Sequence, residues 1–206
     1  MRNKKYTLLL ASFAFLLVFS CKENDPVSLE NRGLIAEKAM VVAARGEASK
    51  IGLMIMEKGG NAFDAMIGTE LALAVAYPFA GNLGGGGFMV FRLENGEIGS
   101  LDYREKAPLA ATRDMYLDEN GNVIPELSTL GALAVGVPGT VAGMFEVHRR
   151  FGTLPMEEIL APVIELAEKG VVVTSNQEKR LASNRDKFIK VNGENTFFAR
   201  EFKTNE

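Results

Sequence analysis

The segment from Ala62 to Tyr77 is apolar on nearly every side, and this feature constrains the fold most. Gly59–Gly60 ends a preceding helix that we expect over residues 47–58. Asn61 offers a side-chain cap, and Asp64 lies three residues further on, as in a capping box. Since a helix that is apolar all round must be buried, the rest of the chain has to cover this one.

Strand signals are few and lie together in the middle of the chain. Residues 88–93 and 98–103 flank the sequence Glu-Asn-Gly-Glu, which predicts a β-hairpin. Three more helices are expected, the first from 139 to 150, the second from 155 to 169 and the third from about 176 to 190. Because helices surround a small sheet, we predict a layered α+β fold.

Composition excludes several classes of protein. With 23 Lys and Arg against 26 Asp and Glu, the net charge is −3, and no basic run follows the first five residues, so a nucleic-acid-binding role is not expected. The single Cys rules out an internal disulfide and a Cys-rich zinc site, and we expect no metal. The single His, His148, is expected to be a solvated residue near a helix end. The acidic run at 118–122 is expected to be a turn and no calcium loop.

The N-terminus resembles the signal peptide of a bacterial lipoprotein. Arg2, Lys4 and Lys5 precede an apolar run at 8–20 that is too short to span a bilayer. Cys21 follows a small residue at the end of this run and would be the lipidated first residue of the mature protein. We therefore expect residues 1–20 to be a signal peptide and 21–31 a polar tether. The protein would be a membrane-anchored lipoprotein of the bacterial cell envelope. The alternative is an ordinary signal peptide with an incidental cysteine.

Two segments are candidates for binding. Gly84–Gly87 lacks the residues of a phosphate-binding loop and precedes a strand, so a close approach of backbone to another element is favoured. Arg104, just after the second expected strand, has a planar guanidinium that can hold a carboxylate with two hydrogen bonds. It can equally pair with its neighbours Asp102 and Glu105 on the surface, and the residues alone leave both roles open.

Four blocks of sequence carry a resemblance to a known family. They are GGNAFDAMIGTELALAV, AGNLGGGGFMVFR, LDYREKAPLAATRDMYLD and GVPGTVAGMFEVHRRFGTLP. In this order they resemble the N-terminal part of the large subunit of γ-glutamyltransferases, also called glutathione hydrolases. The resemblance runs from about Met40 to the last residue, so residues 32–206 are expected to be this portion.

The resemblance implies a fold and a site. Family members adopt the N-terminal-nucleophile αββα sandwich and need no cofactor. They cut themselves from a precursor to expose a threonine that starts the small subunit. The arginine of the family's R-E-x-A-P motif, here Arg104, grips the α-carboxylate of the γ-glutamyl group. Thr129, Thr140 and Thr153 lack the following His of the family's Thr-Thr-His signature, so no catalytic residue is expected in this sequence.

The function implied is hydrolysis of γ-glutamyl amides such as glutathione, with transfer of the glutamyl group to water or an amino acid. The chain is then expected to be a truncated large subunit, inactive alone, whose partners are the γ-glutamyl peptide, a small subunit from the same precursor and the membrane. One alternative is a non-catalytic lipoprotein that binds amino-acid or γ-glutamyl carboxylates. Another is a related acylase acting on glutaryl side chains. The intact REKAP block favours the hydrolase over the non-catalytic lipoprotein.

Overall fold

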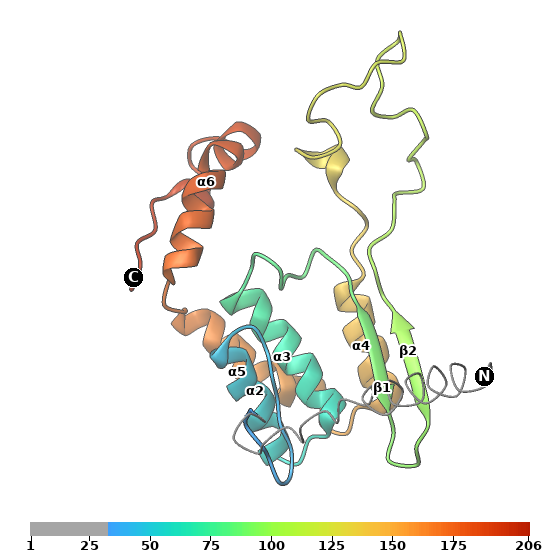
Figure 1. Cartoon of the computed structure of the whole chain (residues 1–206), viewed down its shortest axis with the longest axis vertical. Coiled ribbons are helices and arrows are strands. Elements are labelled where there is room, and N and C mark those ends of the chain that lie inside the picture. Colours follow the sequence, from blue (N-terminus) through green and yellow to red (C-terminus); the bar gives the residue numbers. More distant parts are fainter. Residues whose placement is uncertain (1–32) are drawn as a thin grey trace, which may run out of the picture. The chain divides into compact units, whose positions relative to one another are not determined.

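The structure, a computed structural model, describes residues 33–206. The chain divides into two units, residues 1–40 and residues 41–206. Residues 33–40 contain neither helix nor strand, and the helices and strands of the described part all lie in the second unit (Figure 1). The expected signal peptide and the whole of the expected tether, including Cys21, lie outside the described residues.

The first two helices of the described part lie within one residue of their predicted boundaries. Helix α2 spans Gly46–Glu57 and helix α3 spans Ala62–Ala76. The Asn61 side chain accepts the N–H of Asp64 at 3.0 Å, and the Asp64 carboxylate accepts the N–H of Asn61 at 3.0 Å. The predicted capping box is therefore confirmed. Every residue of α3 except Ala62 is buried or half-buried, which confirms the expectation of a covered helix.

Helices α2 and α3 pack closely because glycines lie at their contact. A Cβ on Gly68 of α3 would overlap the Cδ1 of Ile55 on α2. Four helices share one core, in which Ile55, Ile67, Met144 and Ile159 are all fully buried. Each such side chain contributes about 1.5 to 3 kcal/mol through removal of apolar surface from water.

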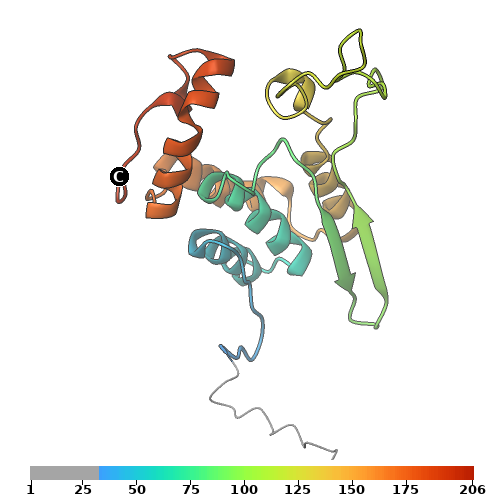
Figure 2. The same ribbon diagram turned by 45° about the horizontal axis from the view of Figure 1, so that its top comes forward.

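The predicted hairpin is present. Strands β1 (Phe88–Arg92) and β2 (Ile98–Asp102) are antiparallel. The turn between them uses Gly96, whose φ of 89° lies in the left-handed region that favours glycine. On the inner face, the Phe91 ring lies 4.8 Å from the ring of Phe151 in the next helix. This aromatic contact fixes the hairpin beside helix α4 (Figure 2).

Helices α4 (Thr140–Phe151) and α5 (Met156–Lys169) follow, joined by residues 152–155. His148 lies in the last turn of α4, is half-buried, and its Nε2 lies 2.8 Å from the carbonyl oxygen of Leu154. The prediction of a solvated histidine is therefore wrong. His148 is half-buried because the chain turns back over it at Gly152. A Cβ on Gly152 would lie only 2.5 Å from the imidazole Cδ2.

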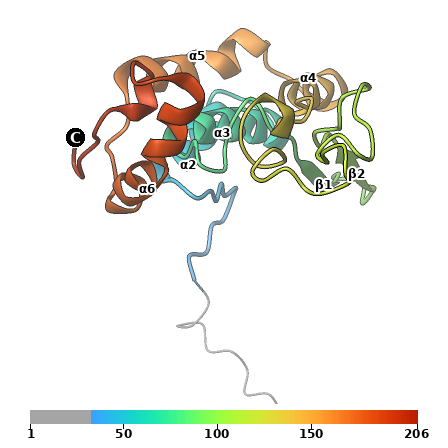
Figure 3. The same cartoon turned by 90° about the horizontal axis from the view of Figure 1, so that it is seen from above.

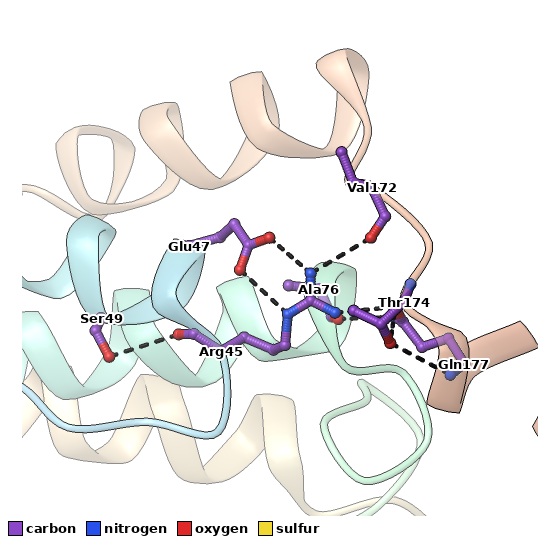
Figure 4. A network of polar contacts seen from close by, with 7 residues as sticks. All are labelled: Arg45, Glu47, Ser49, Ala76, Val172, Thr174 and Gln177. Atoms are coloured by element: carbon purple, nitrogen blue, oxygen red, sulfur yellow. Dashed lines mark hydrogen bonds and ion pairs between the residues drawn. The ribbon is translucent and has the colours of Figure 1, made fainter. Parts of the chain in front are cut away.

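Helix α6 (Ser175–Asn192) is held to the earlier helices by a polar network around Arg45 (Figure 4). The Arg45 guanidinium donates to the Glu47 carboxylate at 2.6 Å and to the Gln177 side-chain oxygen at 2.9 Å. Gln177 in turn donates to the carbonyl oxygen of Ala76 at the end of α3, at 3.0 Å. The Arg45 hydrogen bond lowers the pKa of Glu47. The start of α6 is thus tied to α2 and α3.

The α+β prediction is confirmed, because one two-stranded sheet packs against helices (Figure 3). Within residues 33–206, no helix has both the length and the apolar character needed to cross a bilayer.

Candidate functional site

A long segment, residues 103–139, leaves the end of β2 and returns to the start of α4; we call it the arm (Figure 1). Its two limbs meet where Lys106 and Val137 form an antiparallel bridge, with N–H···O distances of 3.1 and 2.7 Å. Near its tip, the Asp118 carboxylate accepts the N–H groups of Asn120 and Asn122, so the predicted turn is confirmed. These hydrogen bonds lower the pKa of Asp118.

Arg104 lies at the base of the arm, and its side chain is 65% exposed. Its Nε lies 3.9 Å from the Glu105 carboxylate, beyond hydrogen-bond distance. Asp102 accepts the backbone N–H of Arg104 at 3.0 Å and forms no ion pair with its guanidinium. Neither neighbour forms a hydrogen bond with the guanidinium, so the N–H donors along its edge are available to a ligand.

Glycines from two distant blocks of sequence enclose the backbone of Arg104. A Cβ on Gly86, which precedes β1, would lie 2.6 Å from the Arg104 Cα, a distance that real Cβ atoms do not adopt. A Cβ on Gly139, which precedes α4, would lie 3.0 Å from the Arg104 carbonyl oxygen. The Gly139 N–H also donates to the carbonyl oxygen of Gly85 at 2.8 Å. The predicted close approach at Gly84–Gly87 is confirmed, and it occurs at the candidate site.

The neighbouring Tyr103 ring is held in the same way. A Cβ on Gly87 would lie 2.7 Å from the Tyr103 Cε2, and one on Gly143 of α4 would lie 2.6 Å from its Cβ. Burial, and then the charge of Glu70 on α3, raise the pKa of Tyr103. Because Tyr103 is packed on both sides, the residue that follows it starts from a fixed backbone.

Two hollows open beside Arg104. The arm hollow, of about 600 Å³, is lined by residues 104–108, 111–112, 115–116 and 133–136. The α4 hollow, of about 280 Å³, is lined by residues 101–104, 106, 137–139, 142–143 and 146. Arg104 and Lys106 line both, so two cations face the space in which a ligand of Arg104 would lie.

The carboxylates of the α4 hollow do not cancel this charge. Glu146 forms ion pairs with Arg149 at 2.8 Å and with Arg150 at 2.6 Å. These hydrogen bonds lower the pKa of Glu146 to about 2. Asp102 already accepts the N–H of Arg104. In the arm hollow, the Glu105 carboxylate lies 3.9 Å from the Arg104 Nε, so one carboxylate faces the two cations there. The α4 hollow, whose carboxylates are already engaged, is suited to an anion. In the part of the chain that the structure describes, no three His, Cys, Asp or Glu side chains are grouped to hold a metal ion.

Comparison with known proteins shows the family of the chain. The model of the gamma-glutamyltranspeptidase family matches residues 48–205. The chain belongs to this family. Its members are enzymes, and the expected γ-glutamyltransferase resemblance is confirmed.

Individual relatives agree with the family match. The glutathione hydrolase proenzyme of Pseudomonas sp. (strain A14) is 44% identical over 92% of this chain. The crystal structure of the Helicobacter pylori γ-glutamyltranspeptidase covers 84% of this chain and 51% of its own, with 41% identity and a TM-score of 0.79. The corresponding enzyme of Pseudomonas nitroreducens covers the same shares, with 44% identity and a TM-score of 0.76. These γ-glutamyltranspeptidases are N-terminal-nucleophile hydrolases, as expected for the fold.

The chain spans only 32% of the length of the glutathione hydrolase proenzyme of Pseudomonas sp. (strain A14). The family match includes all four quoted blocks, which the fold brings together at Arg104 or in the core beneath it.

Sequence reasoning did not single out Lys106 or the packing of Tyr103. The available signal for Lys106 was its spacing of two residues from Arg104, which places both side chains on one side of an extended chain.

Proposed function

We propose that this chain forms the γ-glutamyl-binding part of a glutathione hydrolase, with Arg104 binding the α-carboxylate of the γ-glutamyl group. One observation carries the proposal: backbone from two glycine-containing blocks encloses that of Arg104, and Arg104, with an exposed side chain, lines two hollows. The names of the relatives at 44–48% identity, all glutathione hydrolase proenzymes, support the same substrate.

The chemistry proposed is acyl transfer. A threonine hydroxyl attacks the γ-carbonyl carbon, its proton passes to the free amine of the same threonine, and the amide nitrogen leaves protonated. The resulting γ-glutamyl ester is then attacked by water or by an amino acid, which regenerates the hydroxyl. We place this threonine outside the 206 residues, in a small subunit cut from the same precursor, because no threonine here has the family's setting. Arg104 holds the substrate for the attack.

The two alternatives have less support. A non-catalytic lipoprotein would need no partner subunit, and the coding sequence downstream distinguishes it: a Thr-Thr-His run there identifies the enzyme. A glutaryl acylase would act on substrates that have no α-amino acid group beside the carboxylate. The names of the relatives at 44–48% identity favour the γ-glutamyl substrate.

Substitution of Arg104 in the full-length gene product tests the proposal. Loss of one partner of a charge-assisted pair leaves the other charge without a partner and costs about 2 to 5 kcal/mol. Arg104→Ala should therefore lower kcat/KM for a γ-glutamyl anilide by roughly thirtyfold or more. Arg104→Lys keeps the charge but loses the planar pair of donors, so it should recover only part of this loss.

The matched control is Arg113→Ala, because Arg113 lies in the same arm, its side chain is 92% exposed, and among residues 33–206 it forms an ion pair only with Asp114. This variant should keep its kinetics. If Arg104→Ala matures normally on a gel and keeps kcat/KM within threefold of the wild type, Arg104 does not bind the carboxylate.

We also propose that the protein is a lipoprotein of the bacterial cell envelope, anchored through Cys21. The proposal rests on the charged start, the short apolar run and the position of the single cysteine. Metabolic labelling with a radioactive fatty acid should label the wild type and not Cys21→Ala. Equal labelling of both would show that Cys21 is not the acylated residue.

A further inference from the structure

Lys106 is a second cation on the same side of the arm as Arg104. Its backbone pairs with Val137 in an antiparallel bridge, and alternate residues of an extended chain project to the same side. Both residues line the arm hollow and the α4 hollow. A ligand carboxylate on Arg104 would therefore lie beside a hollow that Lys106 also lines.

The charge of Lys106 is not neutralised within the described part of the chain. Lys106 forms no ion pair there, whereas Glu146 is engaged by Arg149 and Arg150. The Asp102 carboxylate accepts the N–H of Arg104, and the Glu105 carboxylate, in the arm hollow, lies 3.9 Å from the Arg104 Nε. An ammonium group without a partner beside an anion-binding arginine favours a ligand that has a second negative charge.

We propose that Lys106 binds a second carboxylate of the substrate, so that the site prefers γ-glutamyl peptides with a free C-terminal carboxylate over neutral γ-glutamyl amides. This inference rests on the proposed function, because it takes the first carboxylate to be bound by Arg104. The arm hollow, at about 600 Å³, lies in the size range of pockets that hold ligands larger than a single amino acid.

The type of side chain fits this role. Lysine places a compact charge on a flexible four-carbon stem, so it can follow a carboxylate whose position differs from one peptide to another. An exposed pair of this kind contributes modestly and is screened by salt. The effect of Lys106 should therefore appear in KM and depend on ionic strength, whereas kcat should change little.

Three donors and four proteins test the inference in the full-length gene product at low salt. The donors are glutathione, glutathione whose glycine carboxylate is converted to the carboxamide, and a γ-glutamyl anilide. The proteins are the wild type, Lys106→Gln, Lys106→Arg and the control Lys50→Gln. Lys50 is exposed on α2 and lines neither hollow.

Lys106→Gln should raise KM for glutathione about three- to fivefold, with kcat within twofold of the wild type. The carboxamide and the anilide, which lack the second carboxylate, should be affected less than twofold. Lys106→Arg should keep most of the affinity for glutathione, and Lys50→Gln should behave as the wild type. The difference between the donors should shrink at 0.5 M salt.

Two results would overturn the inference, and they differ from each other. If the wild type cleaves all three donors and Lys106→Gln changes them equally or not at all, Lys106 binds no second carboxylate, while the proposed function stands. If the wild type, fully matured, cleaves none of the donors, the proposed function is wrong and the role of Lys106 is wrong with it.

Discussion

The hydroxyl of Thr153 donates to Asp64 Oδ2 at 2.5 Å, across 89 residues of sequence. The same carboxylate accepts the backbone N–H groups of Asn61, Thr153 and Leu154 at 3.0 to 3.3 Å. Asp64 is fully buried. One side chain thus caps helix α3 and also holds the segment between α4 and α5 against the start of that helix.

Asp64→Ala should destabilise the protein strongly. The substitution removes the acceptor of four donors in a buried place, and each buried donor without a partner costs about 1 to 3 kcal/mol. Because the donors can relax in part, we expect a loss of about 3 kcal/mol or more in the free energy of unfolding. Asp64→Asn keeps one acceptor oxygen and should lose less. Chemical denaturation of the full-length product measures both values.

The control is Asp114→Ala, because Asp114 is exposed and pairs only with the adjacent Arg113. Its loss should stay within about 0.5 kcal/mol. An Asp64→Ala variant as stable as Asp114→Ala would show that the buried carboxylate does not hold the two segments together.

The local role of Asp64 could be predicted from the sequence, whereas its distant role could not. A capping box is a pattern of four consecutive residues, so Asn61 and Asp64 are sufficient to predict it. The contact with Thr153 depends on how α4 returns past α3, and no spacing in the sequence specifies that path. His148 shows the same limit, since its position at a helix end was evident but the chain that folds back over it was not.

Gly86→Ala should displace Arg104, because the new Cβ would lie 2.6 Å from the Arg104 Cα. Gly84→Ala is a matched control within the same run of glycines. Its Cβ would meet only the Asn82 Oδ1, at an ordinary 3.7 Å. We expect Gly86→Ala to lower kcat/KM for a γ-glutamyl anilide at least tenfold. A displaced Arg104 guanidinium would lose about 1.4 kcal/mol or more of transition-state stabilisation. Gly84→Ala should stay within twofold.

Both variants should be assayed after self-cleavage has been checked on a gel, so that a folding defect is recognised. Equal kinetics for Gly86→Ala and Gly84→Ala would mean that the close approach at Gly86 does not position Arg104.

The candidate site was only partly predictable for a related reason. Arg104 was identified from a motif of neighbouring residues, and the family resemblance gave its role. The glycines that enclose it come from before β1 and before α4, so they are brought together only by the packing of the hairpin against α4. A glycine run in a sequence indicates a close approach of backbone, but it does not identify the partner.

Glu70 predicts a dependence of stability on pH. It is half-buried in α3, and burial raises its pKa above the usual range. The folded protein therefore holds this proton at pH values where the unfolded chain has released it, so Glu70 weakens stability as pH rises from about 4.5. Glu70→Gln, which carries no charge, should have a higher Tm than the wild type at pH 7. The two should converge at pH 4 and below.

The control for this experiment is Glu94→Gln, because Glu94 is exposed in the hairpin turn. Thermal unfolding of the three proteins between pH 4 and pH 8 separates the effects. A Glu70→Gln variant whose Tm differs from that of the wild type by the same amount at pH 4 and pH 7 would contradict the prediction.

Residues 21–206 alone should have no γ-glutamyl hydrolase activity. An N-terminal-nucleophile mechanism needs a threonine whose own amine is free, and no threonine in this sequence has the family's Thr-Thr-His setting. Arg104 can hold a substrate carboxylate, but binding without a nucleophile and oxyanion donors does not lower the barrier to amide cleavage. The purified chain should therefore release no chromogenic amine from a γ-glutamyl anilide above the buffer rate, and it should not cleave itself on storage. The full-length gene product serves as the positive control in the same assay. If residues 21–206 cleave the anilide and Arg104→Ala abolishes this activity, the nucleophile lies within these residues. The proposal that a separate small subunit carries the nucleophile would then be wrong.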